Sequence, residues 1–90
     1  MMEKVKQFIK DNKLSFKEGS RNSDSVVLAG FCCYLDLKLR DVQEIKDCIK
    51  EVCPDHDDFE GEFDRVFDFA YCNDYAKYWN TEEAKKSYIF

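Results

Sequence analysis

The sequence has 90 residues and a formal net charge of −5. A chain of this length forms one domain, which excludes a large two-domain enzyme with its own cofactor-binding fold. Eight Phe, five Tyr and one Trp, within an apolar share of 44%, supply a core and argue against disorder. With three Gly and one Pro, the chain lacks the frequent turns of a β-sandwich or barrel. We therefore expect an all-α fold, a compact bundle of four to five helices.

The charge is distributed unevenly along the chain. Residues 1–40 carry eight Lys/Arg against five Asp/Glu, a net charge of +3, whereas residues 41–90 carry six against fourteen, a net charge of −8. A simple nucleic-acid binder would be basic throughout. The division predicts two surfaces with different partners, one built from the basic first half and one from the acidic second half.

The first predicted helix covers residues 3–12. Val5, Phe8 and Ile9 recur at the i, i+3, i+4 spacing of one helix face, with lysines at other positions. Residues 13–23 contain Gly and Ser and show no period, so we expect a loop there.

The second predicted helix covers residues 24–37, with Ser23 or Asp24 as its N-cap. It is apolar on almost every side, a pattern that fits a buried helix or a buried strand. Its length of about fourteen residues favours a helix. A helix that is apolar all round lies in the centre of a bundle, with neighbours packed around it.

The third predicted helix covers residues 41–53. Asp41 and Glu44 match the capping box that begins many helices, and Pro54 marks the end because proline cannot continue a helix. The apolar positions step by three, four and three residues, as one buried helix face requires. They are Val42, Ile45, Ile49 and Val52.

Two further segments complete the predicted bundle. Residues 57–72 combine an apolar stripe with an acidic face, and acidic residues suit the first turn of a helix. Residues 74–80 form a shorter aromatic segment, and Thr81 is placed to cap a last short helix. The expected single domain, 1–90, thus has an N-terminal helix at 1–15, a helical core at 16–79, and a tail or short helix at 80–90.

Five cysteines, at positions 32, 33, 48, 53 and 72, point to a reducing compartment. Their number is odd and the first residues are charged, whereas a secreted disulfide scaffold shows an even set and an apolar leader. We expect a cytoplasmic protein with mostly buried, reduced thiols. The longest apolar stretch is about ten residues, far short of the roughly 20 that span a bilayer, so no membrane partner is expected.

No self-sufficient catalytic or metal site is evident. Cys53-Pro54-Asp55-His56 lacks the paired Cys-x-x-Cys knuckles of structural zinc sites. The acidic run that begins at Asp55 has Glu60 where a calcium loop needs Gly. There is one His, no Gly-rich phosphate loop and no nucleophile elbow. We expect no enzyme activity, no cofactor and no metal.

The second half offers two alternative partner surfaces. Aromatic residues gather near its end, and Tyr and Trp are common in interface hot spots. The candidate interface residues are Tyr71, Tyr75, Tyr78 and Trp79, and closure of the bundle is the alternative reading of this cluster. The carboxylates between residues 55 and 78 suggest a different function, a small phage or mobile-element inhibitor that imitates the phosphate charge of DNA.

The segment 16–30 carries a family resemblance. Its loop Glu18-Gly19-Ser20-Arg21-Asn22 and the following Val26-Val27-Leu28-Ala29-Gly30 resemble the E-G-x-R-N loop and the Leu-Ala-Gly helix of the PriCT-type primase C-terminal helical domain. The resemblance extends over residues 16–79. The second half is more acidic than a nucleic-acid binder of this kind should be, and we expect the catalytic domain to which such a module is normally fused to lie on another chain.

The resemblance implies a non-catalytic accessory subunit of a primase or DNA polymerase in a mobile-element or phage replication module, including cassette-chromosome elements. Such a subunit would bind its polymerase or primase partner and a single-stranded DNA template, with a helicase as a further expected partner, and would assist de novo primer synthesis. Arg21 offers a planar fork for phosphate, or else pairs with an acidic side chain of the fourth helix, and Asn22 contacts nucleic acid or holds the turn. The candidate nucleic-acid or nucleotide residues are Lys13, Lys17, Arg21, Asn22, Lys38 and Arg40, which are expected to lie on one side.

Overall fold

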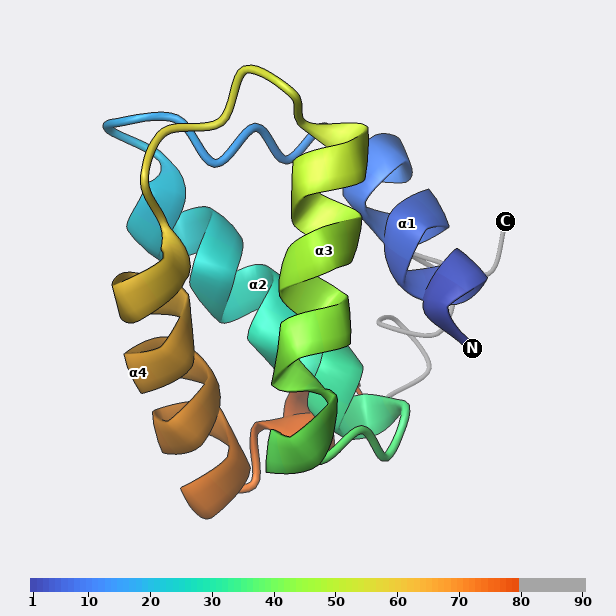
Figure 1. Ribbon diagram of the computed structural model, residues 1–90. Coiled ribbons are helices and arrows are strands. Elements are labelled where there is room, and N and C mark those ends of the chain that lie inside the picture. Colours follow the sequence, from blue (N-terminus) through green and yellow to red (C-terminus); the bar gives the residue numbers. More distant parts are fainter. Residues whose placement is uncertain (80–90) are drawn as a thin grey trace.

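In a computed structural model, residues 1–79 are the part of the chain that the structure describes, and side chains are described for residues 1–77. This part contains four α-helices and two short 3-10 helices joined by loops (Figure 1). The α-helices are α1 (Met2–Asp11), α2 (Arg21–Tyr34), α3 (Val42–Val52) and α4 (Glu60–Cys72). The 3-10 helices are η1 (Leu39–Asp41) and η2 (Tyr75–Trp79). The described residues contain no strand, and the predicted all-α bundle is confirmed. The predicted tail or short helix at 80–90 lies outside the described residues.

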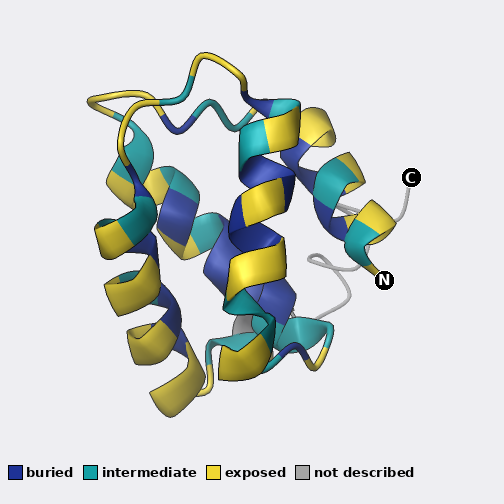
Figure 2. Cartoon of the chain, in the orientation of Figure 1, coloured by how far each residue is buried: buried dark blue, intermediate teal, exposed yellow. Residues whose placement is uncertain are grey.

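The helix α2 occupies the centre of the bundle, as its apolar sequence predicts. It packs chiefly against α4 and η2, whereas α1 packs mainly against α3. The buried faces of the helices turn toward one interior (Figure 2). The largest fully buried side chains come from α1, α2, α3, α4 and two loops. They are Val5, Ile9, Phe16, Ser25, Leu28, Cys32, Ile45, Ile49, Phe59, Phe63 and Phe67.

The helix α2 begins three residues earlier than predicted, at Arg21 rather than Asp24. Asp24 therefore lies inside the first turn and is not the N-cap; Ser20 holds that position, without a side-chain capping bond. The Oδ2 atom of Asp24 instead accepts hydrogen bonds from the backbone N–H groups of Ser15 and Phe16, at 3.1 and 3.0 Å. The carboxylate thus joins the preceding loop to α2. From the sequence alone, this role cannot be distinguished from that of an N-cap.

The capping box predicted at Asp41 and Glu44 is also wrong. Asp41 ends the 3-10 helix η1, and α3 begins at Val42 without a side-chain capping bond. The Oδ2 atom of Asp41 turns back and accepts the backbone N–H of Lys38 at 2.8 Å. Residues 38–41, at the junction of the second and third predicted helices, are thus held as one tight turn.

Ion pairs join α3 to α4. Lys46 is only 8% exposed. Its Nζ lies 3.0 Å from Oδ1 of Asp64 and 3.9 Å from Oε1 of Glu60. Lys50 Nζ lies 3.1 Å from the same Glu60 oxygen. Lysines of one helix and carboxylates of its neighbour thus alternate along this side of the bundle, where the sequence suggests an uninterrupted acidic face.

The thiols are mostly shielded, as predicted. Cys32, Cys48 and Cys53 are buried, Cys33 is half-buried and Cys72 is exposed. Burial, with a contribution from the carboxylate of Asp74, raises the pKa of the Cys33 thiol to about 11. None of the helices among residues 1–79 combines the length and apolar character needed to cross a membrane.

Candidate functional site

Two loops meet at one end of the bundle and hold each other in place (Figure 1). One precedes α2 (residues 12–20) and the other precedes α4 (residues 53–59); together they are called the paired loops. The backbone N–H of Asp57 donates to the carbonyl of Phe16 at 3.0 Å, and the N–H of Glu18 donates to Asp57 Oδ2 at 2.6 Å. The resemblance to the primase module rests on the first of these loops, which is therefore fixed against the acidic second half.

Phe16 anchors the paired loops in the core. Its side chain is fully buried, and its ring centroid lies 5.4 Å from that of Phe59 and 6.5 Å from that of Phe63. The backbone of Phe16 has φ = +55°, a left-handed conformation that is strained for a bulky residue. Strain of this kind persists where the surroundings over-determine it, and here two hydrogen bonds hold the Phe16 backbone.

The backbone conformation at Gly19 accounts for the choice of glycine. Its φ is +97°, a region that side chains with a β-carbon rarely adopt, while no other atom lies within 4 Å of the place where a β-carbon would stand. Glycine is required here for backbone conformation and not for space.

The side chain of Arg21 makes a hydrogen bond within the protein. Its Nη1 donates to the backbone carbonyl of Asp58 at 2.7 Å, a partner that neither the phosphate nor the carboxylate expectation included. This is the one contact of the Arg21 guanidinium among the described residues, and the group has five N–H donors. Asn22 is exposed beside it, as are Lys13 and Lys17. The prediction that these four contact nucleic acid is untested, but the structure brings them to one end of the bundle.

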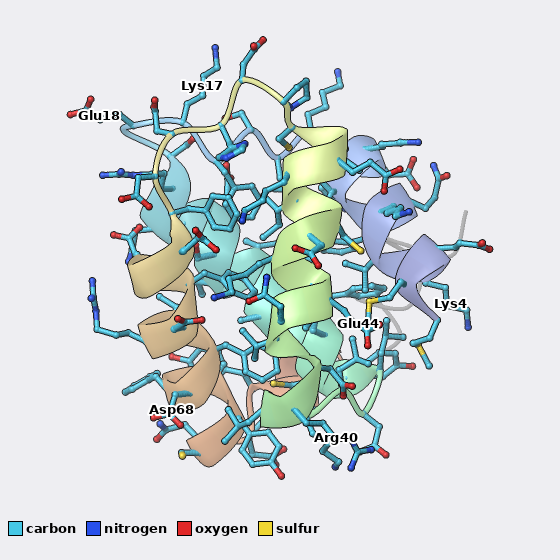
Figure 3. All side chains as sticks on the ribbon, in the orientation of Figure 1. Lys4, Lys17, Glu18, Arg40, Glu44 and Asp68 are labelled. Carbon is cyan, nitrogen blue, oxygen red and sulfur yellow. The ribbon has the colours of Figure 1, made fainter. Side chains whose placement is uncertain are left out.

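Lys38 and Arg40 lie at the other end. Figure 3 shows Lys17 and Arg40 at opposite ends of the molecule. The helix α2 separates them, and its 14 residues correspond to about 21 Å. The expectation that all six basic and polar candidates lie on one side is therefore wrong, because it ignored the direction in which α2 carries the chain.

Lys38 joins the aromatic candidates instead. Its Nζ lies 2.6 Å from Oδ1 of Asp36 and 5.8 Å from the ring centroid of Tyr71, within the range of a cation–π contact. The hydrogen bond between the two charged groups raises the pKa of Lys38 and lowers that of Asp36. A residue predicted for nucleic acid and a residue predicted for a protein partner thus share one surface.

The other aromatic candidates are placed in part. Tyr75 is half-buried, and its ring meets the edge of the exposed Phe69 ring at a centroid distance of 5.7 Å. Tyr78 and Trp79 belong to η2, and their side chains lie outside the described ones. Sequence reasoning missed Leu39, whose 48% exposure puts a large apolar side chain next to Lys38 and Arg40. The position of this leucine between two basic residues is the feature of the sequence that could have indicated its exposure.

The prediction of two surfaces with different partners stays a prediction, but the basic and acidic halves of the chain are in contact in the fold. The backbone N–H of Glu18 donates to Asp57, and Arg21 at the start of α2 donates to the backbone carbonyl of Asp58. Glu60 and Asp64 of α4 meet lysines of α3. Sequence halves of different charge fold against one another because α2 and α4 are neighbours. Among residues 1–79, no group of three or more His, Cys, Asp or Glu side chains is arranged to hold a metal ion.

A comparison with protein-family models, with curated proteins and with solved structures found no match. The primase resemblance therefore remains a prediction from the residues that carry it.

Proposed function

We propose that this chain is a non-catalytic accessory subunit of a primase or DNA polymerase in a mobile-element or phage replication module. It binds the catalytic chain and assists primer initiation by contacting the single-stranded template or the initiating nucleotide. The observation that carries the proposal is the fixed loop before α2 together with the first turn of that helix, which carry the exposed Lys17 and Asn22 and the bonded Arg21.

The chemistry of this end suits a phosphate backbone. Lysine and arginine side chains bind phosphate, and amide side chains add hydrogen bonds without selecting a base. The backbone around Lys17 is already bonded to its surroundings, since its carbonyl accepts the N–H groups of Ser20 and Arg21 at 3.0 and 2.9 Å. Little conformational freedom is lost when a ligand binds to a loop fixed in this way.

The alternative, an acidic inhibitor that imitates DNA, receives less support. Such a mimic displays a row of carboxylates that are free to meet the basic groups of an enzyme. On α4, Glu60 and Asp64 are neutralised by Lys46 and Lys50 of the neighbouring helix. Asp57 is occupied by a backbone N–H of the other paired loop.

We expect a polymerase or primase among the neighbouring genes, and the test is primer synthesis by that enzyme, measured with and without the protein. We expect primers only, or mainly, when the protein is present. Lys17→Ala should lower both primer yield and single-strand affinity severalfold, and the affinity should fall as salt rises from about 50 to 200 mM. Lys17 is the better choice than Arg21, because Arg21→Ala also removes the bond to Asp58.

The matched control is Lys4→Ala, an exposed lysine of α1 on another side of the molecule (Figure 3). It should leave priming and template affinity unchanged. The proposal is wrong if the catalytic chain makes as many primers alone, or if Lys4→Ala and Lys17→Ala behave alike.

A further inference from the structure

The end of the bundle opposite the paired loops carries a second candidate surface, formed by Lys38, Leu39, Arg40 and Tyr71 and called the η1 surface. Leu39 and Tyr71 are 48% and 42% exposed, and both belong to the few large hydrophobic residues that the described chain leaves open. The Arg40 side chain is 82% exposed, and the carboxylate with which it is paired, that of Asp41, is 3.9 Å away.

The geometry points to a protein partner: we propose that the η1 surface docks a segment of the catalytic chain that pairs an apolar side chain with a carboxylate. The apolar group covers Leu39 and the Tyr71 ring, and the carboxylate meets the Arg40 guanidinium. This inference rests on the proposed function and adds to it the surface that the partner uses.

The η1 surface is ordered before any partner binds. Asp36 holds the ammonium group of Lys38, and that group lies over the Tyr71 ring. Asp41 holds the backbone N–H of Lys38, which fixes the start of the 3-10 helix. Tyr and Arg are among the residue types that most often anchor interfaces, and a turn whose backbone is already fixed loses less freedom on binding.

The charges of this surface favour protein over nucleic acid. The carboxylates of Asp36 and Asp41 flank the two basic side chains, so a phosphate backbone would meet as many negative groups as positive ones. A polypeptide can place a single carboxylate on Arg40, which has the longer ion pair of the two cations, whereas a phosphate backbone brings several negative groups past both aspartates. Leu39 gains from an apolar contact and offers nothing to a phosphate.

The two ends can act together. The η1 surface and the loop before α2 are separated by the length of α2, about 21 Å. A catalytic chain bound at one end therefore leaves Lys17 and Asn22 accessible at the other. This arrangement assigns Lys38 and Arg40 to the partner and leaves the template to the paired loops.

The test measures, by titration calorimetry, the affinity for the intact polymerase or primase that the proposed function expects among the neighbouring genes. Arg40→Glu and Leu39→Ser, both at exposed positions, are each expected to weaken binding about tenfold or more. Arg65→Glu is the matched control, since it reverses the charge of an exposed arginine on α4. Circular dichroism checks that each variant is folded, and Lys17→Ala should keep full partner affinity.

The outcomes separate the two proposals. If the wild type does not bind the catalytic chain, the proposed function fails and this inference fails with it. If the wild type binds and Arg40→Glu and Leu39→Ser bind equally well, only the η1 surface is wrong. A loss of single-strand affinity in Arg40→Glu with unchanged protein affinity would also overturn the inference, because the surface would then belong to nucleic acid.

Discussion

The carboxylate of Asp24 lies at the backbone of Phe16 and accepts its N–H at 3.0 Å. Because Phe16 is fully buried and left-handed at its backbone, this bond keeps a strained residue in the core. The loop that carries Lys17 depends on it, since the chain must turn at Phe16 before it reaches α2.

Removing the Asp24 carboxylate should loosen this loop. Asp24→Ala leaves the N–H groups of Ser15 and Phe16 without their acceptor, which we expect to lower the free energy of unfolding by about 1–3 kcal/mol. Asp24→Asn keeps one acceptor oxygen and should lose less. Urea unfolding at neutral pH measures both variants; equal stability of wild type and Asp24→Ala would show that the bonds contribute nothing.

Phe16 itself gives an unusual comparison between Ala and Gly. Either truncation removes a buried ring and should cost about 3–5 kcal/mol. Glycine also relieves the left-handed strain of about 1–2 kcal/mol that alanine keeps, so Phe16→Gly should be at least as stable as Phe16→Ala. The measurement is urea unfolding in a stabilising osmolyte, which keeps both variants folded at the start.

The control for that comparison is Ile9, a fully buried residue in the ordinary helix α1. There Ile9→Gly should be less stable than Ile9→Ala by about 1 kcal/mol. If Phe16 shows the same order and margin as Ile9, its backbone is not strained in solution.

Replacement by alanine should change the stability of the protein in opposite directions at two glycines. Gly19→Ala meets no neighbouring atom but must adopt φ = +97°, so we expect a loss of about 1 kcal/mol or more. Gly61 lies in α4, and a β-carbon there meets Arg65 Nη1 at an ordinary 3.9 Å. Gly61→Ala should therefore stabilise the protein by up to about 1 kcal/mol. Thermal unfolding of the pair checks the signs, and a stabilising Gly19→Ala would contradict the loop conformation.

The helices could be predicted from the sequence because their signal is local. The apolar spacing of Val5, Phe8 and Ile9 gives α1 within one residue at each end, and Pro54 correctly bounds α3. The start of α4 was placed at residue 57 instead of Glu60, because Asp57 and Asp58 look like a first helical turn. The backbone N–H of Asp57 is instead bonded to Phe16 in the loop before α2, and the carbonyl of Asp58 to the side chain of Arg21 in α2.

The candidate site was harder to predict because its contacts are distant in the chain. Glu18 and Asp57 are 39 residues apart, and nothing local shows that they meet. The same holds for Lys38 and Tyr71, whose contact depends on how α4 and η1 pack. Charge totals for each half of the chain carry no information about such contacts.

The ion pairs of Lys46 should contribute little to stability although its side chain is well covered. Asp64 and Glu60 are half exposed and stay hydrated when the ammonium group is removed. We expect Lys46→Met, which keeps the apolar stem, to lose at most about 1 kcal/mol. Unfolding in low salt and in about 1 M salt measures the electrostatic part, which should vanish in high salt. A loss of several kcal/mol that persists in high salt would contradict this.

Thiol reactivity should distinguish Cys72 from the other cysteines. Cys72 is exposed, whereas Cys33 is half-buried with a pKa of about 11. Because the pKa is raised, less of the thiol is ionised at a given pH. At pH 8 only about one in a thousand Cys33 thiols is ionised. Burial also raises the pKa of Cys32, Cys48 and Cys53.

We therefore expect iodoacetamide at pH 8 to modify the folded protein in one fast step at Cys72, with the other thiols slower by at least tenfold. Mass spectrometry of the time course measures this, and Cys72→Ser should remove the fast step alone. Unfolding in urea should make all five cysteines react. Fast labelling that persists in Cys72→Ser under native conditions would mean that a second thiol is exposed in solution, contrary to the packing around α2 and α3.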